Sequence, residues 1–129
     1  MIIFASFKFE AAHRLPFLPA DHQCGRLHGH TYRVDLELSA SVADVLKSPQ
    51  GWIMDFDEVA RVWQATIFAK LDHRFLNDIP GMENPTSEHL ACWIFSELRF
   101  ALPLLSAVAV YETTETCARV TRADMIGAP

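Results

Sequence analysis

HGHTYRVDLELS, residues 28–39, alternates between two sets of side chains. The first set turns apolar after two histidines and comprises His28, His30, Tyr32, Val34, Leu36 and Leu38. The second set is polar and comprises Thr31, Arg33, Asp35, Glu37 and Ser39. Because successive side chains of a strand point to opposite faces, the stretch predicts a half-buried strand. Both histidines would lie on its buried face with Cβ atoms roughly 7 Å apart, a workable span for two ligands of one metal.

A second alternating stretch precedes it at residues 2–13 and ends with His13 on its apolar side. An antiparallel pairing of the two strands would place their histidine-bearing ends close together. His13, His28 and His30 then form a candidate metal site. Imidazole suits zinc, and three protein ligands leave one position open for water or substrate, as in catalytic zinc sites. The alternative for His28 and His30 is a pair of histidines satisfied by hydrogen bonds at a strand start.

Residues 14–27 contain two prolines and a glycine and predict a long loop between the two strands. A loop of this length in a small domain is more often functional than idle. Cys24 lies in it, and three interpretations stay open. Cys24 is a buried packing residue, a thiolate base or nucleophile favoured by a nearby zinc ion or Arg26, or a fourth zinc ligand that would close the site and make it structural.

Two helices are expected next. The first begins after Asp55 as N-cap, with Glu58 as its capping-box partner, and its apolar residues recur at helical spacing as far as Leu71. The second follows Thr86 or Ser87 as its cap.

Strands are expected again at residues 104–112 and 115–122. With strands grouped at both ends of the chain, the order strand, strand, helix, helix, strand, strand favours an α+β fold. We expect a single domain, residues 1–129, with an antiparallel four-stranded sheet and two helices on one face. Such a sheet has open edges, which must be blunted or paired with another subunit.

Two further groups suggest chemistry. Asp72 and His73 follow the first helix, where a carboxylate that orients an imidazole would suit proton transfer. The simpler alternative is a histidine favoured by the helix dipole beside a solvated carboxylate.

Glu112 ends an apolar strand, where it is either exposed or able to accept two parallel hydrogen bonds from a ligand edge with adjacent N–H groups. Glu88 is assigned mostly to the first turn of the second helix.

The overall composition narrows the function classes. A formal net charge of −5 argues against a nucleic-acid partner, because phosphate binding requires a basic surface. No apolar run is long enough to cross a bilayer and no export signal is visible, so we expect no membrane partner and a cytoplasmic location. The three cysteines lack the spacing of a disulfide framework, and Cys92 and Cys117 are expected to be small packing residues.

Five motifs in order resemble the 6-pyruvoyltetrahydropterin synthase family over residues 4–122. They are Phe9-Glu10-Ala11-Ala12-His13, Cys24 with three intervening residues before His28-Gly29-His30, Leu71-Asp72-His73 with Leu76-Asn77, Asn84-Pro85-Thr86-Ser87-Glu88, and Glu112-Thr113. The short spacing between Cys24 and His28 is most similar to the bacterial branch of the family that makes 6-carboxy-5,6,7,8-tetrahydropterin in queuosine biosynthesis.

The resemblance implies the tunnelling fold, in which ββααββ subunits join their sheets around a barrel as homo-oligomers, commonly hexamers. It implies Zn²⁺ on the three histidines, Cys24 as the catalytic thiol, and Asp72 and His73 as a proton-transfer pair. Glu112 would anchor the pterin, and Thr86, Ser87 and Glu88 would help to bind the ring.

The implied reaction converts 7,8-dihydroneopterin triphosphate to 6-carboxytetrahydropterin, acetaldehyde and triphosphate. The alternatives are a 6-pyruvoyltetrahydropterin synthase, which eliminates triphosphate, and a zinc-stabilised binding module without turnover.

Overall fold

Five strands form one sheet, in the order β3-β1-β2-β4-β5, in the computed structural model, which describes residues 1–127. The central strand β2 (His28–Ser39) pairs antiparallel with β1 (Ile2–His13) on one side and with β4 (Leu105–Tyr111) on the other. β5 (Cys117–Thr121) extends the sheet beyond β4, also antiparallel. The opposite edge is β3 (Arg74–Phe75), which runs parallel to β1.

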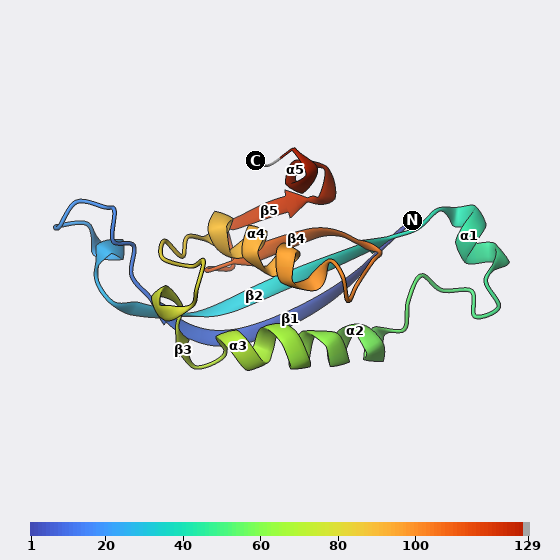
Figure 1. Ribbon diagram of the computed structural model, residues 1–129, viewed down its shortest axis with the longest axis horizontal. Coiled ribbons are helices and arrows are strands. Elements are labelled where there is room, and N and C mark those ends of the chain that lie inside the picture. The colour runs from blue at the N-terminus through green and yellow to red at the C-terminus, as the bar shows by residue number, and fades with distance from the viewer. Residues whose placement is uncertain (128–129) are drawn as a thin grey trace.

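Helices and helical turns occupy the connections. In chain order they are η1 (Gln23–Gly25), α1 (Val42–Lys47), α2 (Phe56–Trp63), the π-helical segment η2 (Gln64–Phe68), α3 (Ala69–Leu71), η3 (Leu76–Asp78), α4 (Ser87–Leu98) and α5 (Arg122–Ile126). Figure 1 shows the run from α2 to α3 alongside β1 and α4 alongside β4, while α1 and the loop that carries η1 lie at opposite ends of the molecule. No helix among residues 1–127 combines the length and apolar character needed to span a bilayer.

The hydrophobic core lies between one face of the sheet and the helices that cover it, the run from α2 to α3 and α4. The inward face of the strands supplies Phe9 and Tyr32, whose rings stack with centroids 4.8 Å apart, and Phe7, whose ring stacks on Trp63 of α2 at the same distance. Tyr32, Val34, Leu36 and Leu38 are completely buried. The alternation expected for residues 2–13 and 28–39 is therefore confirmed, as are two helices that pack on one face of the sheet.

The predicted four-stranded sheet is wrong, because β3 adds a fifth strand. Two residues, Arg74 and Phe75, are too few to show an alternating pattern, and they join the sheet only because the chain after α3 runs alongside β1. The last expected strand is also shorter than predicted. It ends at Thr121, which caps α5 by a reciprocal pair of hydrogen bonds with Asp124.

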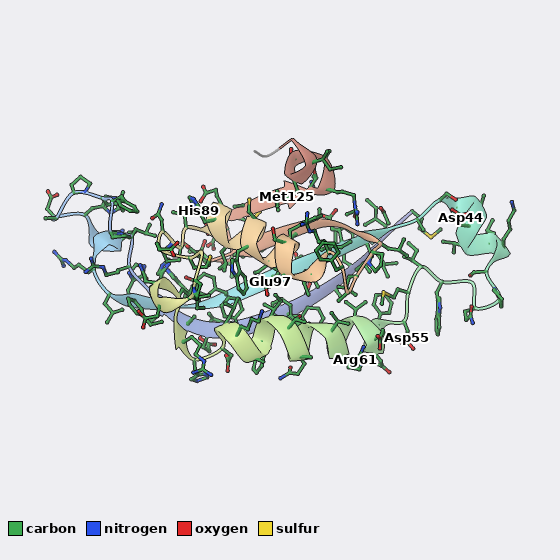
Figure 2. The ribbon with its side chains drawn as sticks, viewed as in Figure 1. Asp44, Asp55, Arg61, His89, Glu97 and Met125 are labelled. Carbon is green, nitrogen blue, oxygen red and sulfur yellow. The ribbon has the colours of Figure 1, made fainter. Side chains whose placement is uncertain are left out.

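The helix starts were predicted from capping residues, Asp55 with Glu58 for the first helix and Thr86 or Ser87 for the second. Asp55 caps α2 by accepting the N–H of Asp57, but Glu58 does not complete a capping box, because its carboxylate pairs with Arg61 instead. Thr86 caps α4 by accepting the N–H of His89. Figure 2 shows Asp55 at the start of α2 and His89 in the first turn of α4.

Candidate metal centre and active site

Three histidines meet where β1 ends and β2 begins. The β1–β2 register pairs His13 with His28 and Ala11 with His30, so all three imidazoles lie on the core side of the sheet. One nitrogen from each ring lies within 4.8 Å of the others. The ring centroids are 4.6, 4.9 and 5.1 Å apart. The group that was predicted from strand alternation is thus assembled within one chain.

Hydrogen bonds to backbone carbonyls decide the tautomers of two of these rings. The Nδ1 of His13 lies 2.8 Å from the carbonyl oxygen of Pro85, and the Nδ1 of His28 lies 2.7 Å from that of Arg26. Because a carbonyl oxygen only accepts, each Nδ1 must carry the proton. The two Nε2 atoms, 3.0 Å apart, then face each other with lone pairs. Two lone pairs at that distance repel each other unless a proton or a cation lies between them.

The ring of His30 also has a nitrogen without a hydrogen-bond partner. The Nε2 of His30 is buried and has no hydrogen-bond partner among the described residues. Burial lowers the pKa of His13 and of His30, which keeps these imidazoles neutral, the form that binds metals. Backbone carbonyls that hold the Nδ1 protons, as at His13 and His28, are a usual surrounding of histidines that bind a transition metal. The three histidines therefore fit a transition-metal ion.

Cys24 lies near the end of the loop that precedes β2, in the single turn η1. Its side chain is half-buried, and it makes no disulfide. Its sulfur is not among the ligand atoms that converge with the three histidines.

Asp72 and His73 lie on the β3 side of the sheet and form a hydrogen-bonded pair. The Asp72 carboxylate accepts from the Nδ1 of His73 at 2.7 Å and from the backbone N–H of Glu10 at 3.0 Å. The Glu10 N–H, and then the His73 ring, hold the pKa of Asp72 below its usual range, so it stays ionised. Because the carboxylate fixes the proton on Nδ1, the Nε2 of His73 is left as a proton acceptor.

The backbone of His73 is held in an uncommon conformation. Its φ of +55° lies in the left-handed region, and its N–H donates to the Glu10 carbonyl at 2.6 Å. The ring is exposed at the rim of two cavities of about 730 and 570 Å³. The pair is thus rigidly tied to β1, while no hydrogen bond among residues 1–127 joins it to Cys24.

A third group gathers around Glu112, just after β4. Glu112 lines a cavity of about 360 Å³ with the predicted ring contacts Thr86, Ser87 and Glu88. The negative charge of Glu112 raises the pKa values of His13 and His30 against the larger effect of burial, which lowers them. The structure therefore brings together the residues that were predicted to hold a ring.

Several contributors to the site had no clear signal in the sequence. Cys117, expected to be a packing residue, is exposed and lines the Glu112 cavity together with Leu15 and Thr116. Cys92 is exposed as well, so the packing role is wrong for both cysteines. The carbonyls of Pro85 and Arg26 and the peptide of Glu10 act through backbone atoms, which every residue carries, so composition and spacing could not single them out.

Comparisons with known proteins agree with this geometry. A sequence model of the family described as 6-pyruvoyl tetrahydropterin synthase matches residues 2–123. The chain belongs to this family. A member from Synechocystis, named 6-carboxy-5,6,7,8-tetrahydropterin synthase, is 40% identical over 119 residues, which cover 92% of this chain and 91% of that protein.

Two more family members extend the comparison. A protein from Archaeoglobus fulgidus, named as a putative 6-carboxy-5,6,7,8-tetrahydropterin synthase, is 36% identical over 95% of this chain and 96% of its own length. Among solved structures, the 6-pyruvoyl tetrahydropterin synthase of Caenorhabditis elegans superposes with a TM-score of 0.80 at 23% identity, covering 94% of each chain. The superposition on the Caenorhabditis elegans structure shows that the α+β fold is that of the family.

Proposed function

We propose that this protein is a zinc-dependent 6-carboxy-5,6,7,8-tetrahydropterin synthase of queuosine biosynthesis. It would convert 7,8-dihydroneopterin triphosphate to 6-carboxytetrahydropterin, acetaldehyde and triphosphate. The observation that carries the proposal is the 40% identity with the Synechocystis protein of that name over nearly the whole of both chains. Five motifs, a three-histidine group and a separate Asp72–His73 pair support it.

We assign the metal to His13, His28 and His30. Zn²⁺ suits three imidazoles, and when bound it would stabilise negative charge on the side-chain oxygens of the substrate. The carbonyls of Pro85 and Arg26 hold two of the rings in the tautomer that such a cation needs.

We assign proton transfer to Cys24, Asp72 and His73. Asp72 orients the His73 ring and leaves its Nε2 free to accept a proton from a substrate carbon or to return one. Cys24 would be the second acid–base group, held off the metal.

Because no hydrogen bond joins these groups within residues 1–127, we propose that Cys24 of one copy meets His73 of a second copy. The sheet leaves β5 at an edge that another copy could extend, which supports self-association into a barrel, with a hexamer expected.

We assign recognition of the pterin ring to Glu112, with help from Thr86, Ser87 and Glu88. A carboxylate can accept two parallel hydrogen bonds from a ring edge that presents adjacent N–H groups. Thr86 of this cavity of about 360 Å³ follows Pro85, whose carbonyl contacts His13, so we propose that a ring held there directs its side chain toward the histidines. We treat residues 1–129 as one domain that carries all of these groups.

The deciding experiment is an assay of the purified protein with 7,8-dihydroneopterin triphosphate. Release of acetaldehyde supports the proposed reaction. Release of triphosphate without acetaldehyde would instead identify a 6-pyruvoyl tetrahydropterin synthase, the activity for which the family is named.

The zinc content of a Cys24→Ala variant tests the alternative of a zinc-stabilised binding module without turnover. If zinc were held by four protein ligands including the thiol, Cys24→Ala would lose zinc as well as activity. We expect Cys24→Ala to keep the zinc content of the unsubstituted protein and to lose acetaldehyde production. Cys92→Ala, which replaces an exposed cysteine on α4, should keep both and serves as the matched control.

A further inference from the structure

An imidazole outside the metal group contacts the backbone of Cys24. His22 is the N-cap of the turn η1, with φ of −70° and ψ of 130°, and its Nδ1 accepts the Cys24 N–H at 3.1 Å. An N-cap side chain usually accepts from the second or third residue of the turn, and Cys24 is the second. His22 therefore takes the place that serine, asparagine or aspartate fills at most helix starts.

Backbone hydrogen bonds complete the support of this turn. The Cys24 carbonyl accepts the N–H of Leu15 at 2.9 Å, and the N–H of Gly25 donates to the His22 carbonyl at 3.0 Å. His22 in turn donates its own N–H to Pro19 at 2.9 Å. Both polar groups of the Cys24 backbone are thus engaged, one by a ring and one by the start of the loop, and the thiol is the part of the residue left for chemistry.

We infer that His22 is a positioning residue that sets the place of the Cys24 thiol. This inference rests on the proposed function, in which Cys24 exchanges a proton with a carbon of the substrate. Proton transfer of this kind depends steeply on distance, and a displacement of about 1 Å can cost about a hundredfold in rate. The exposed His22 side chain touches neither the histidine group nor the Glu112 cavity, so its effect would reach the reaction through the turn.

Three substitutions separate this role from a general effect on the loop. His22→Ala removes the acceptor. His22→Asn restores it, because the Oδ1 of asparagine and the Nδ1 of histidine are each one bond from Cγ. Gln23→Ala, at the exposed next residue of the same turn, is the control, since no hydrogen bond of its side chain is found among the described residues.

The first measurement is the amide hydrogen-exchange rate of Cys24, which reports the contact without requiring turnover. Losing an N-cap acceptor should raise this rate about five- to thirtyfold in His22→Ala. His22→Asn and Gln23→Ala should exchange like the unsubstituted protein. An unchanged rate in His22→Ala would overturn the inference, whatever reaction the protein catalyses.

The second measurement is steady-state acetaldehyde production. In His22→Ala we expect kcat to fall about five- to thirtyfold, KM and zinc content to stay the same, and His22→Asn to recover most of kcat. An equal loss of kcat in His22→Ala and His22→Asn, or a change confined to KM, would refute the positioning role. If the unsubstituted protein releases no acetaldehyde, the proposed function is wrong. If His22→Ala keeps the kcat of the unsubstituted protein, only the inference about His22 is wrong.

Discussion

The hydroxyl of Tyr32 is a buried polar group beside the three histidines. It has no hydrogen-bond partner among the described residues, and the residue is completely buried. The ring is held independently of the hydroxyl, by stacking on Phe9 and by edge contacts with His13 and His30 at centroid distances of 5.9 and 5.5 Å. Tyr32→Phe therefore removes an unsatisfied group and leaves the packing of the ring in place.

The size of the effect follows from two opposing quantities. An unsatisfied buried hydroxyl costs about 1–3 kcal/mol, and its removal returns that amount. The void left by one oxygen, roughly 12 Å³, costs about 0.3 kcal/mol at ~24 cal/mol per Å³. We expect Tyr32→Phe to raise the free energy of unfolding by about 1 kcal/mol, which corresponds to ~4 °C in Tm for a chain of this size.

Urea denaturation followed by circular dichroism measures this difference directly. Tyr111→Phe is the control, because Tyr111 is only half-buried and the guanidinium of Arg33 lies over its ring at 3.8 Å. We expect no measurable change there. A loss of 1 kcal/mol or more in Tyr32→Phe would refute the reasoning, because it would mean that the hydroxyl has a partner in the folded protein.

Three other predictions concern the buried histidines, the Glu112 cavity and the turn at Gly81. Burial lowers the pKa of His13 and of His30 in the folded protein below the 6.5 of a free imidazole. The stability that these neutral rings contribute to the metal-free protein is therefore present above about pH 6.5 and is lost as the pH falls through their pKa values in the folded state. A urea midpoint that stays constant from pH 7 to pH 5 would contradict this prediction. Glu112→Ala should keep its zinc and weaken pterin binding by about 2–4 kcal/mol, as measured by calorimetry, and unchanged affinity would make Glu112 an ordinary strand end. Gly81→Ala should lower the unfolding free energy by about 1 kcal/mol in the same urea assay, because Gly81 has a φ of +85°, and no loss would show that the turn relaxes.

The histidine group could be predicted from the sequence because it depends on only two local facts. Alternation places His28 and His30 on one face of a strand, and the same rule places His13 at the end of its neighbour. Once the strands pair antiparallel, the register has little freedom, since a slip by one residue would turn the apolar side chains to the solvent. The location of the histidine group therefore follows from hydrophobic burial.

Other elements escaped prediction for physical reasons that differ. β3 has two residues and exists only through its pairing with β1, so no local pattern predicts it. α1 had a usable signal, because Ser41 caps it and accepts the N–H of Asp44, but its six residues carry too short an apolar pattern to stand out. The support of the Asp72–His73 pair comes from the peptide of Glu10, more than sixty residues earlier, and no side-chain pattern records such a contact.

Pro85 joins two parts of the site through a single peptide. Its carbonyl accepts the Nδ1 proton of His13, and the next residue, Thr86, caps α4 and lines the Glu112 cavity. A shift of the His13 imidazole would act on the peptide that precedes Thr86, so we expect cation binding by the three histidines and occupancy of the cavity to be thermodynamically linked. Linkage is reciprocal: whatever factor a bound cation applies to the affinity for the ring, the bound ring must apply to the affinity for the cation.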